Sequence, residues 1–296
     1  MQKTAEALSA QDPELNEVYK KQKGAILMKF IKNYQVVFGA TIIFFFVFIA
    51  IFAPLLAPHD PLATNVQVRL EGPSAIHPFG TDDLGRDMLS RIMFGARISL
   101  SVGIISTAIG GMIGIIIGII AGYYGGKLDI IFGRLIDVQL AFPGMLLALI
   151  IVAILGPSTF NVIISISIFA IPSFARISRG STLNVKKLEY VDAIKAIGAS
   201  DIRVMFRHIF PNILSPLVVH ATLYVGSAIM ISAALSFLGV GTQPPTPEWG
   251  TMLSSGREFL GRAPHIAMFP GVMITLVVIA INMLGDGLRN ALEPKD

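Results

Sequence analysis

The chain has 296 residues, of which 53% are hydrophobic and only 14% are charged. Soluble domains carry about 25% charged residues, so this composition excludes an ordinary soluble protein and indicates an integral membrane protein. The formal net charge is +4 and no cysteine is present. Basic residues of a membrane protein are explained first by its orientation, so we expect no nucleic-acid partner, and the missing thiols exclude disulfides and thiolate metal sites.

The first 32 residues are polar and rich in Lys. They lack the apolar stretch and the small-residue cleavage site of a signal peptide. We therefore expect a cytoplasmic N-terminal segment over residues 1–32, followed by a first span that is retained.

Six membrane spans are predicted, because a helical span needs about 20 mainly apolar residues. Residues 138–175 are too many for one helix and are interrupted at 156–158, so they predict a tight hairpin of two spans. The other four spans are predicted at residues 35–57, 98–126, 213–239 and 263–285. An even number of spans places both termini on one side of the membrane.

Most of the 23 Lys and Arg residues lie in three places: residues 1–32, the predicted loop that holds Lys127 and Arg134, and residues 176–211. Short cytoplasmic loops are enriched in Lys and Arg, so both termini and these loops are predicted to be cytoplasmic. Residues 58–97 and 241–262 then form the two large loops on the other side.

These predictions divide the chain into four parts. The ranges are a cytoplasmic segment at 1–32, a first span with an extracytoplasmic loop at 33–97, a five-span core with a cytoplasmic loop at 176–211 inside the range 98–289, and a cytoplasmic tail at 290–296.

The cytoplasmic loop at 176–211 contains two helical patterns. Apolar residues recur every three positions and predict one stripe of a short helix over residues 186–197. They are Leu188, Val191, Ile194 and Ile197. Gly198 suits the left-handed residue that closes a helix, while Ser200 and Asp201 suit the cap and first turn of the next one. Pro211 is predicted to start span five.

A helix this short is marginally stable alone, so we expect its apolar stripe to be buried. One interpretation is a basic helix that lies on anionic lipid. The other is a compact knob that fits a socket in a partner subunit. Glu189 and Asp192 interrupt the basic face and the glycine corner makes the element compact, which favours the partner subunit.

Two features within the spans have alternative interpretations. Glycines recur every four residues in span two, at Gly110, Gly114, Gly118, Gly122 and Gly126. This spacing lets a second helix approach closely, so we expect helix packing rather than a substrate groove. His220 in span five is a candidate for the translocation path because it is ionisable within an apolar run; a hydrogen bond to a neighbouring helix is the alternative. Met230 is a second candidate for the path.

The sequence DDLGRD at residues 82–87 mixes carboxylates with an arginine. Arg86 can neutralise the acids, and no nearby His or Cys completes a set of transition-metal ligands. We interpret His77 as structural, predict no metal site, and expect a network of ion pairs and turns that shapes this loop.

Several longer motifs then follow one another along the chain. They are HPFGTDDLGRDMLSRIMFGARISL at 77–100, GYYGGKLDIIFGRLIDV at 122–138, ALSFLGVGTQPPTPEWGTML at 234–253 and LGDGLRNALEPK at 284–295. With Asp192, Ala193 and Gly198 followed by Pro211, they resemble the second permease subunit of ATP-binding-cassette (ABC) importers for dipeptides, oligopeptides, glutathione and nickel. The resemblance extends from about residue 33 to the C-terminus.

This resemblance implies an all-α membrane protein with the type I ABC importer permease fold, six transmembrane helices and cytoplasmic termini. The implied partners are a related permease in a heterodimer, one or two ABC ATPase subunits and an extracytoplasmic substrate-binding protein. The implied location is the cytoplasmic membrane of a prokaryote. ATP and Mg²⁺ would be held by the ATPase subunits, and no cofactor is expected on this chain.

In the family, a coupling helix of the cytoplasmic loop docks in a cleft of the ATPase. The residues that the resemblance assigns to this role are Glu189, Tyr190, Asp192, Ala193, Gly198, Ala199, Ser200, Asp201 and Pro211. The loops implied to face the binding protein include Asp83, Arg86, Asp87, Pro245 and Trp249.

The chain departs from the family pattern at four positions. Asp192 replaces Glu, Ile194 replaces the second Ala, His208 replaces Ile, and Phe210 replaces the Leu before the proline. Asp keeps the carboxylate of Glu but reaches less far toward an arginine of the ATPase. Ala193 and Gly198, whose small size permits close docking, are retained.

No zinc-protease, serine-hydrolase or P-loop motif is present, so no enzymatic activity is predicted for the chain itself. The predicted function is translocation in an ATP-driven importer of peptides or peptide-like solutes, with glutathione or a nickel complex as the alternative substrate. A secondary transporter driven by an ion gradient is the alternative from another class. It predicts carboxylates within the spans and an inverted repeat, and the apolar runs carry neither.

Overall fold

The computed structural model describes residues 33–292. The predicted N-terminal segment and the last four residues of the predicted tail lie outside the described residues. Within residues 33–292 the chain is helical, and the only β-type pairing described there is an isolated bridge between Thr81 and Asp87. The all-helical prediction is therefore confirmed for this part of the chain.

Five helices are long and apolar enough to cross a membrane. They are α3 (Tyr34–Leu56), α4 (Met88–Tyr124), α7 (Thr159–Lys186), α10 (Phe210–Phe237) and α12 (His265–Leu292). The short α9 (Asp201–Arg203) and the π-helical turn η2 (Val204–Ile209) run into α10, so that Asp201–Phe237 forms one span-length helix. Pro211 lies in the first turn of α10, as predicted, although α9 and η2 continue the helical path on its N-terminal side.

A sixth span depends on a bent pair of helices. The helices α5 (Gly126–Leu140) and α6 (Gly144–Leu155) meet at an angle of 86°. With 12 residues, α6 is about 18 Å long, whereas the hydrocarbon core is about 30 Å thick. By length and composition, residues 33–292 thus contain five candidate spans, or six if the bent pair is counted as one span.

The prediction of a loop around Lys127 and Arg134 is wrong, because these residues belong to α5. The predicted break before α7 is present. Gly156 ends α6 with a φ of 90°, and the side chain of Ser158 accepts a hydrogen bond from the backbone N–H of Asn161 at the start of α7. The half-length α6 therefore precedes the break and the full-length span α7 follows it, so the predicted hairpin contains two spans only if α5 and α6 together form one of them.

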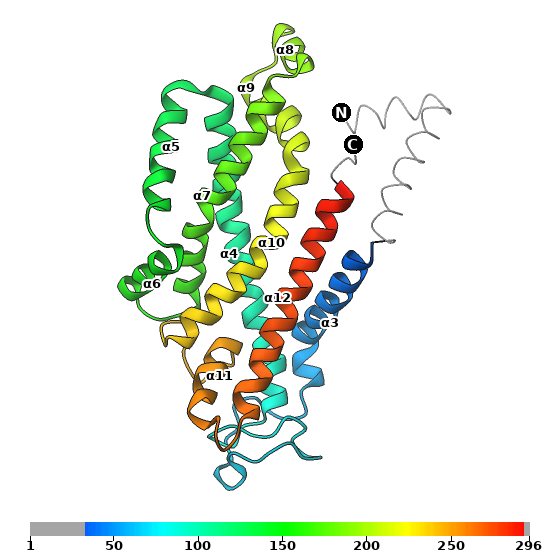
Figure 1. The fold of residues 1–296 in the computed structure, drawn as a ribbon, viewed down its shortest axis with the longest axis vertical. Coiled ribbons are helices and arrows are strands. Elements are labelled where there is room, and N and C mark those ends of the chain that lie inside the picture. The colour runs from blue at the N-terminus through cyan, green and yellow to red at the C-terminus, as the bar shows by residue number, and fades with distance from the viewer. Residues whose placement is uncertain (1–32, 293–296) are drawn as a thin grey trace, which may run out of the picture.

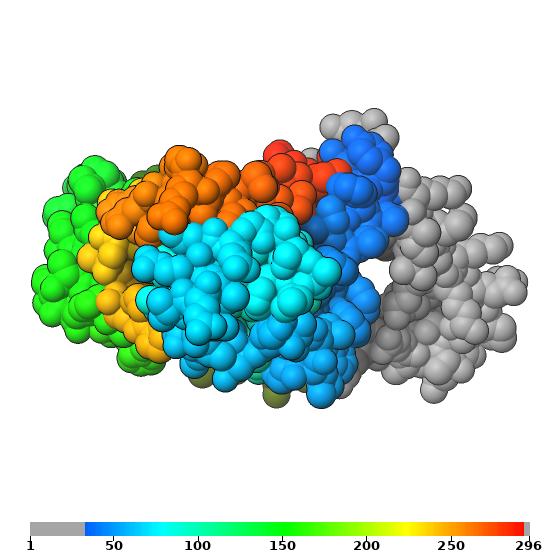
Figure 2. All heavy atoms as spheres, turned by 90° about the horizontal axis from the view of Figure 1, so that it is seen from below, coloured from blue at the N-terminus to red at the C-terminus, as the bar shows by residue number. Residues whose placement is uncertain are grey.

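The long helices form an elongated bundle (Figure 1). The helix α8 (Glu189–Ala196) projects from one end, and the beginning of α3 and the end of α12 lie toward that same end. The helix α11 (Trp249–Gly256) and the loop between α3 and α4 lie at the opposite end (Figure 1). We call these the α8 end and the α11 end. In Figure 2, which views the α11 end, the loop between α3 and α4 in cyan lies beside the orange segment that holds α11.

The helix α4 is central to the bundle, since it contacts α3, α7 and α10, and its pairing with α7 is the most extensive of all. Asp87 is the N-cap of α4 and accepts a 2.7 Å hydrogen bond from the backbone N–H of Ser90. The preceding loop contains the short η1 (Val66–Val68) and packs on α12, where the rings of Phe79 and Phe269 stack at 4.1 Å. A second short turn, η3 (Arg257–Phe259), follows α11. The α11 end is therefore a folded layer attached to α4 and α12.

Candidate functional site

Residues 187–201, which we call the α8 knob, stand beyond the bundle at the α8 end (Figure 1). Its helix, α8, is eight residues long and carries Glu189 and Asp192 in its first turn. Lys195 lies in its last turn, so the charges match the polarity of the helix dipole. The predicted order of short helix, tight turn and second helix is present.

Gly198 closes the α8 knob. Its φ is +86°, a conformation that costs residues with a Cβ about 1–2 kcal/mol. The backbone N–H of Gly198 donates to Lys195 O at 2.9 Å, and that of Ala199 donates to Ile194 O at 3.3 Å, which is the Schellman pattern. An added Cβ would meet nothing within 4 Å, so within this chain the glycine is needed for its backbone conformation. Ser200, the N-cap of α9, makes no side-chain capping bond.

An apolar contact attaches the α8 knob to two long helices. Val191 is fully buried and belongs to a cluster that joins the end of α4 to the helix Asp201–Phe237. The other buried members are Ile119, Tyr123, Val204, Met205, Ile209, Ile213 and Leu217. A displacement of α8 must therefore move the ends of these helices or break this cluster.

Polar contacts reinforce the same attachment. The hydroxyl of Tyr123 donates a 2.6 Å hydrogen bond to Asp201 Oδ1. Lys186 donates to the backbone oxygen of Tyr123, and Lys195 Nζ lies 4.8 Å from the centre of its ring, within the range of a cation–π contact. Tyr123 at the end of α4 thus contacts residues on both sides of α8.

Tyr190 makes a further link on the inner side. Its hydroxyl donates to His208 O at 3.4 Å and accepts from Asn212 Nδ2 at 3.1 Å. Burial raises the pKa of the Tyr190 phenol, so the phenol stays protonated and keeps its donor at neutral pH. Tyr190 therefore faces its own chain rather than solvent.

The outer surface of the α8 knob is open to a partner. Glu189, Asp192, Ala193 and Gly198 are exposed, whereas Ala199 is partly buried. Within this chain Val191 is fully buried and Ile194 is partly buried, whereas Leu188 is 48% and Ile197 is 85% exposed. Burial of Leu188 and Ile197 requires a partner and stays a prediction. A spacing of three residues rotates each side chain by about 60° around the helix relative to the last, so residues nine apart face opposite sides. Only the middle of the stripe can face the bundle.

The glycines of α4 lie along α7. A Cβ at Gly114 would stand 2.6 Å from Ile171 O, and one at Gly122 would stand 2.9 Å from Thr182 Cβ. Gly110 and Gly118 face the backbone of α7 in the same way, at Ser167 and Ala175. Gly126 is different, because it begins α5 and a Cβ there would meet nothing within 4 Å.

His220 lies between α10 and α7. Its Nε2 is 2.8 Å from the hydroxyl of Ser173, and its ring packs edge-on against Phe174 at 4.6 Å. The structure thus contains the interhelical hydrogen bond that was the alternative to a place in the translocation path. Met230 is 55% exposed on α10.

The residues predicted to face a binding protein separate into two groups. Asp83 is partly exposed and Pro245 is exposed. Arg86, Asp87 and Trp249 are buried within the chain, so Asp83 and Pro245 are the members of this group with exposed surface, and the contact of these loops with a binding protein stays a prediction. Trp249 is fully buried because its ring fills the core of the α11 end, where its Nε1 donates a 3.0 Å hydrogen bond to Ile92 O.

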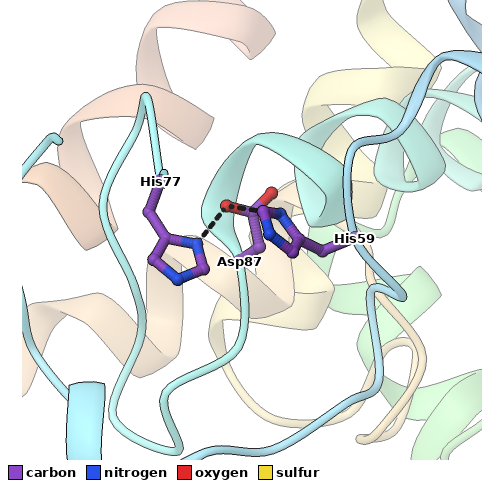
Figure 3. Close-up of side chains that lie close together, drawn as sticks. All are labelled: His59, His77 and Asp87. Carbon is purple, nitrogen blue, oxygen red and sulfur yellow. Dashed lines mark hydrogen bonds and ion pairs between the residues drawn. The ribbon is translucent and has the colours of Figure 1, made fainter. Parts of the chain in front are cut away.

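A further group at the α11 end was not predicted. His59, His77 and Asp87 come together with their potential ligand atoms within 4.8 Å of one another (Figure 3). His59 follows α3 and is separated from His77 by a loop with no periodic pattern, so nothing in the sequence placed the two imidazoles side by side. From the sequence, only His77 was considered beside residues 82–87, and the structure adds His59.

Comparison with known proteins gives a consistent result. Residues 114–295 match the family described as the binding-protein-dependent transport system inner membrane component, and residues 24–73 match the N-terminal transmembrane domain of oligopeptide transport permease C. The chain is 50% identical to the dipeptide transport system permease protein DppC of Alkalihalophilus pseudofirmus, over 89% of this chain and 87% of that protein. It is 47% identical to the glutathione transport system permease protein GsiD of Pectobacterium atrosepticum, over 90% of this chain and 89% of that protein.

A solved structure has a similar fold. It is an inward-facing conformation of the MetNI methionine ABC transporter, with a TM-score of 0.57 and 19% identity. The match covers 70% of this chain and 98% of the solved chain.

Proposed function

The chain belongs to the family of binding-protein-dependent transport system inner membrane components, and on this premise we propose that it is the translocating subunit of an ATP-driven importer for peptides or peptide-like solutes. Two relatives support this substrate class: one is named for dipeptide transport and is 50% identical to this chain, and the other is named for glutathione transport and is 47% identical.

The observation that carries the proposal is the α8 knob. Its base is held by the buried Val191 and by the hydrogen bond from Tyr123 to Asp201, while Asp192 and Ala193 point outward. A short helix that is attached to the bundle at its base and exposed on its outer surface suits the transfer of a displacement from a partner subunit to the spans. We assign the docking surface for a cytoplasmic ATPase to the residues predicted above, with Tyr190 serving to hold the knob from within.

The proposed mechanism is a cycle between two arrangements of the spans. Closure of ATP-loaded ATPase subunits moves the α8 knob as a rigid unit and favours the outward-open arrangement, and hydrolysis returns the spans to the inward-open one. Such coupling requires that the two arrangements bind the ATP-loaded ATPase with different affinity. ATP and Mg²⁺ belong to the ATPase subunits in this scheme.

The remaining assembly follows from the same premise. The α8 end and both termini face the cytoplasm, and the α11 end faces an extracytoplasmic binding protein through exposed positions such as Pro245. A related permease completes the path across the cytoplasmic membrane of a prokaryote. The division into a segment at 1–32, a first span with its loop at 33–97, a core at 98–289 and a tail at 290–296 is part of this proposal.

Reconstitution tests the proposal directly. The chain is co-expressed with its neighbouring genes, purified, and placed in liposomes with binding protein outside and ATP inside. We expect an ATPase to co-purify and a dipeptide or glutathione to accumulate, and we expect Gly198→Pro to abolish uptake. If no ATPase co-purifies and uptake survives Gly198→Pro, the coupling role of the α8 knob is wrong.

A further inference from the structure

The α11 end contains a buried carboxylate without a basic neighbour. Only 1% of the Asp87 side chain is exposed, and a buried carboxylate is unstable unless it is paired or bound to a cation. Arg86 does not pair with it, because Arg86 Nε lies 2.7 Å from Asp82 Oδ2 and Arg91 Nε lies 3.4 Å from the same atom. Among the described residues, no Lys or Arg forms an ion pair with Asp87.

Two imidazoles occupy the place that a basic residue would take (Figure 3). His77 Nδ1 lies 2.9 Å and His59 Nδ1 lies 3.7 Å from Asp87 Oδ1. His59 Nδ1 is buried and has no hydrogen-bond partner. Three potential ligand atoms from three positions in the chain therefore lie within 4.8 Å of one another.

The spacing of these atoms suits a metal ion. Two ligands that each lie about 2.1 Å from one ion are about 3.0–3.6 Å apart when the bond angle is 90–120°. The distances of 2.9 and 3.7 Å to Asp87 Oδ1 lie close to this range. A direct hydrogen bond accounts for the contact of His77, but it leaves the ring nitrogen of His59 without a partner.

Outer contacts hold the ligands in place. Asp87 Oδ2 accepts hydrogen bonds from both the N–H and the hydroxyl of Ser90 at 2.7 Å, which turns Oδ1 toward the imidazoles. The backbone N–H of His59 donates to the same Ser90 hydroxyl at 3.1 Å, and that of His77 donates to Ser74 Oγ at 3.0 Å. Such outer-shell bonds orient the ligands of protein metal sites.

We propose that His59, His77 and Asp87 form a binding site for a divalent first-row transition metal ion, which fastens the loop between α3 and α4 to the N-cap of α4. Two imidazoles and one carboxylate are ligands that suit zinc. His59 is 36% exposed at its side chain, so the fourth position is open to water or to a solute donor. The site does not depend on the transport role proposed above.

Zinc is the probe for the test, and the chain offers few other zinc ligands that would compete. There is no cysteine and there are five histidines. Tag-free full-length chain in nanodiscs is stripped with a chelator, dialysed against Zn²⁺, and analysed for bound zinc and for its melting temperature. We expect one zinc per chain and a melting temperature that rises with zinc concentration, because the ion binds only the folded state.

The variants are His59→Gln and Asp87→Asn, which keep the size of each side chain, and His208→Gln is the matched control far from the cluster. Loss of a ligand should weaken zinc binding by at least the 10- to 100-fold that removal of an outer-shell partner causes, and the control should bind like the unaltered chain. Folding of each variant is checked by its melting curve without zinc. The proposal is overturned if the unaltered chain retains no zinc, as a simple ion pair between His77 and Asp87 predicts, or if folded His59→Gln binds zinc as tightly as the control.

Discussion

The hydroxyl of Tyr123 at the end of α4 donates a 2.6 Å hydrogen bond to the carboxylate of Asp201 at the start of α9, across 78 positions of sequence. This bond attaches the end of the α8 knob to α4. The other end of the α8 knob follows α7, whose Lys186 also donates a hydrogen bond to Tyr123. The strength of the bond between Tyr123 and Asp201 is the first quantity to test.

Tyr123→Phe removes the hydrogen bond and keeps the ring that contacts Lys195. Hydrogen bonds to charged groups contribute about 1.5–3 kcal/mol, and solvent weakens this one because Asp201 is exposed. We therefore expect Tyr123→Phe to weaken the attachment of the α8 knob to α4 by about 1 kcal/mol. If the bond transmits ATPase movement, solute uptake per ATP hydrolysed falls about fivefold. Uptake and hydrolysis are measured in the same proteoliposomes. Tyr34→Phe, an exposed tyrosine at the same end, is the control, and equal coupling ratios in both variants would contradict the role of the bond.

Gly198→Ala tests the turn that closes the α8 knob. The φ of +86° disfavours Ala by about 1–2 kcal/mol, whereas Asn tolerates this conformation better. We expect the amount of co-purifying ATPase to decrease in the order Gly, Asn, Ala. Gly180→Ala is matched, since a Cβ there also meets nothing within 4 Å and its φ is not positive. A normal ATPase yield with Gly198→Ala would show that the left-handed turn is dispensable.

Gly114→Ala tests the contact between α4 and α7. The new Cβ would stand 2.6 Å from Ile171 O, so the helices must separate, and such overpacking typically costs about 1–3 kcal/mol. The expected result is a lower melting temperature in detergent. Gly133→Ala on α5, where a Cβ meets no atom within 4 Å, should leave the melting temperature unchanged or raise it. Equal melting temperatures for the two variants would mean that the helices are less close than described.

Trp249→Ala separates a structural role from a contact with the binding protein. The fully buried ring should cost about 3–5 kcal/mol when it is removed, and Trp249→Phe should recover most of the loss except for the hydrogen bond to Ile92. Pro244→Ser, at an exposed position beside Pro245, should leave stability nearly unchanged and alter only the affinity for the binding protein. Thermal unfolding and binding-protein titration distinguish the two residues. A stable Trp249→Ala with weak docking would restore the interpretation of Trp249 as a contact residue.

The sequence was sufficient where the cause of a feature is local. Gly198 was predicted to close a helix because few residues other than glycine adopt a positive φ readily, and the break after Gly156 followed from a similar preference. The burial of Val191 could be predicted from spacing, but the exposure of Leu188 and Ile197 required knowing how far the stripe turns around the helix.

The failures have a different physical origin. The prediction of a loop around Lys127 and Arg134 depends on the charged residues between two apolar runs. In the structure, two of these charges, Asp129 and Asp137, form ion pairs with Arg179 and Arg176 of α7. Each pair joins residues far apart in sequence, so no local pattern reveals that the charges are compensated. The same reason conceals the approach of His59 to Asp87.

The helix α4 has one more property, which concerns distance. Of the five span-length helices described, α4 is the one without an internal proline; α3, α7, α10 and α12 contain Pro54, Pro172, Pro216 and Pro270. Its 37 residues make a rod about 55 Å long. Tilting such a rod by about 5° displaces its far end by about 5 Å, which exceeds the length of a hydrogen bond. A small change in the tilt of α4 around Tyr123 therefore displaces Asp87, which lies at the α11 end of the bundle, by several ångströms.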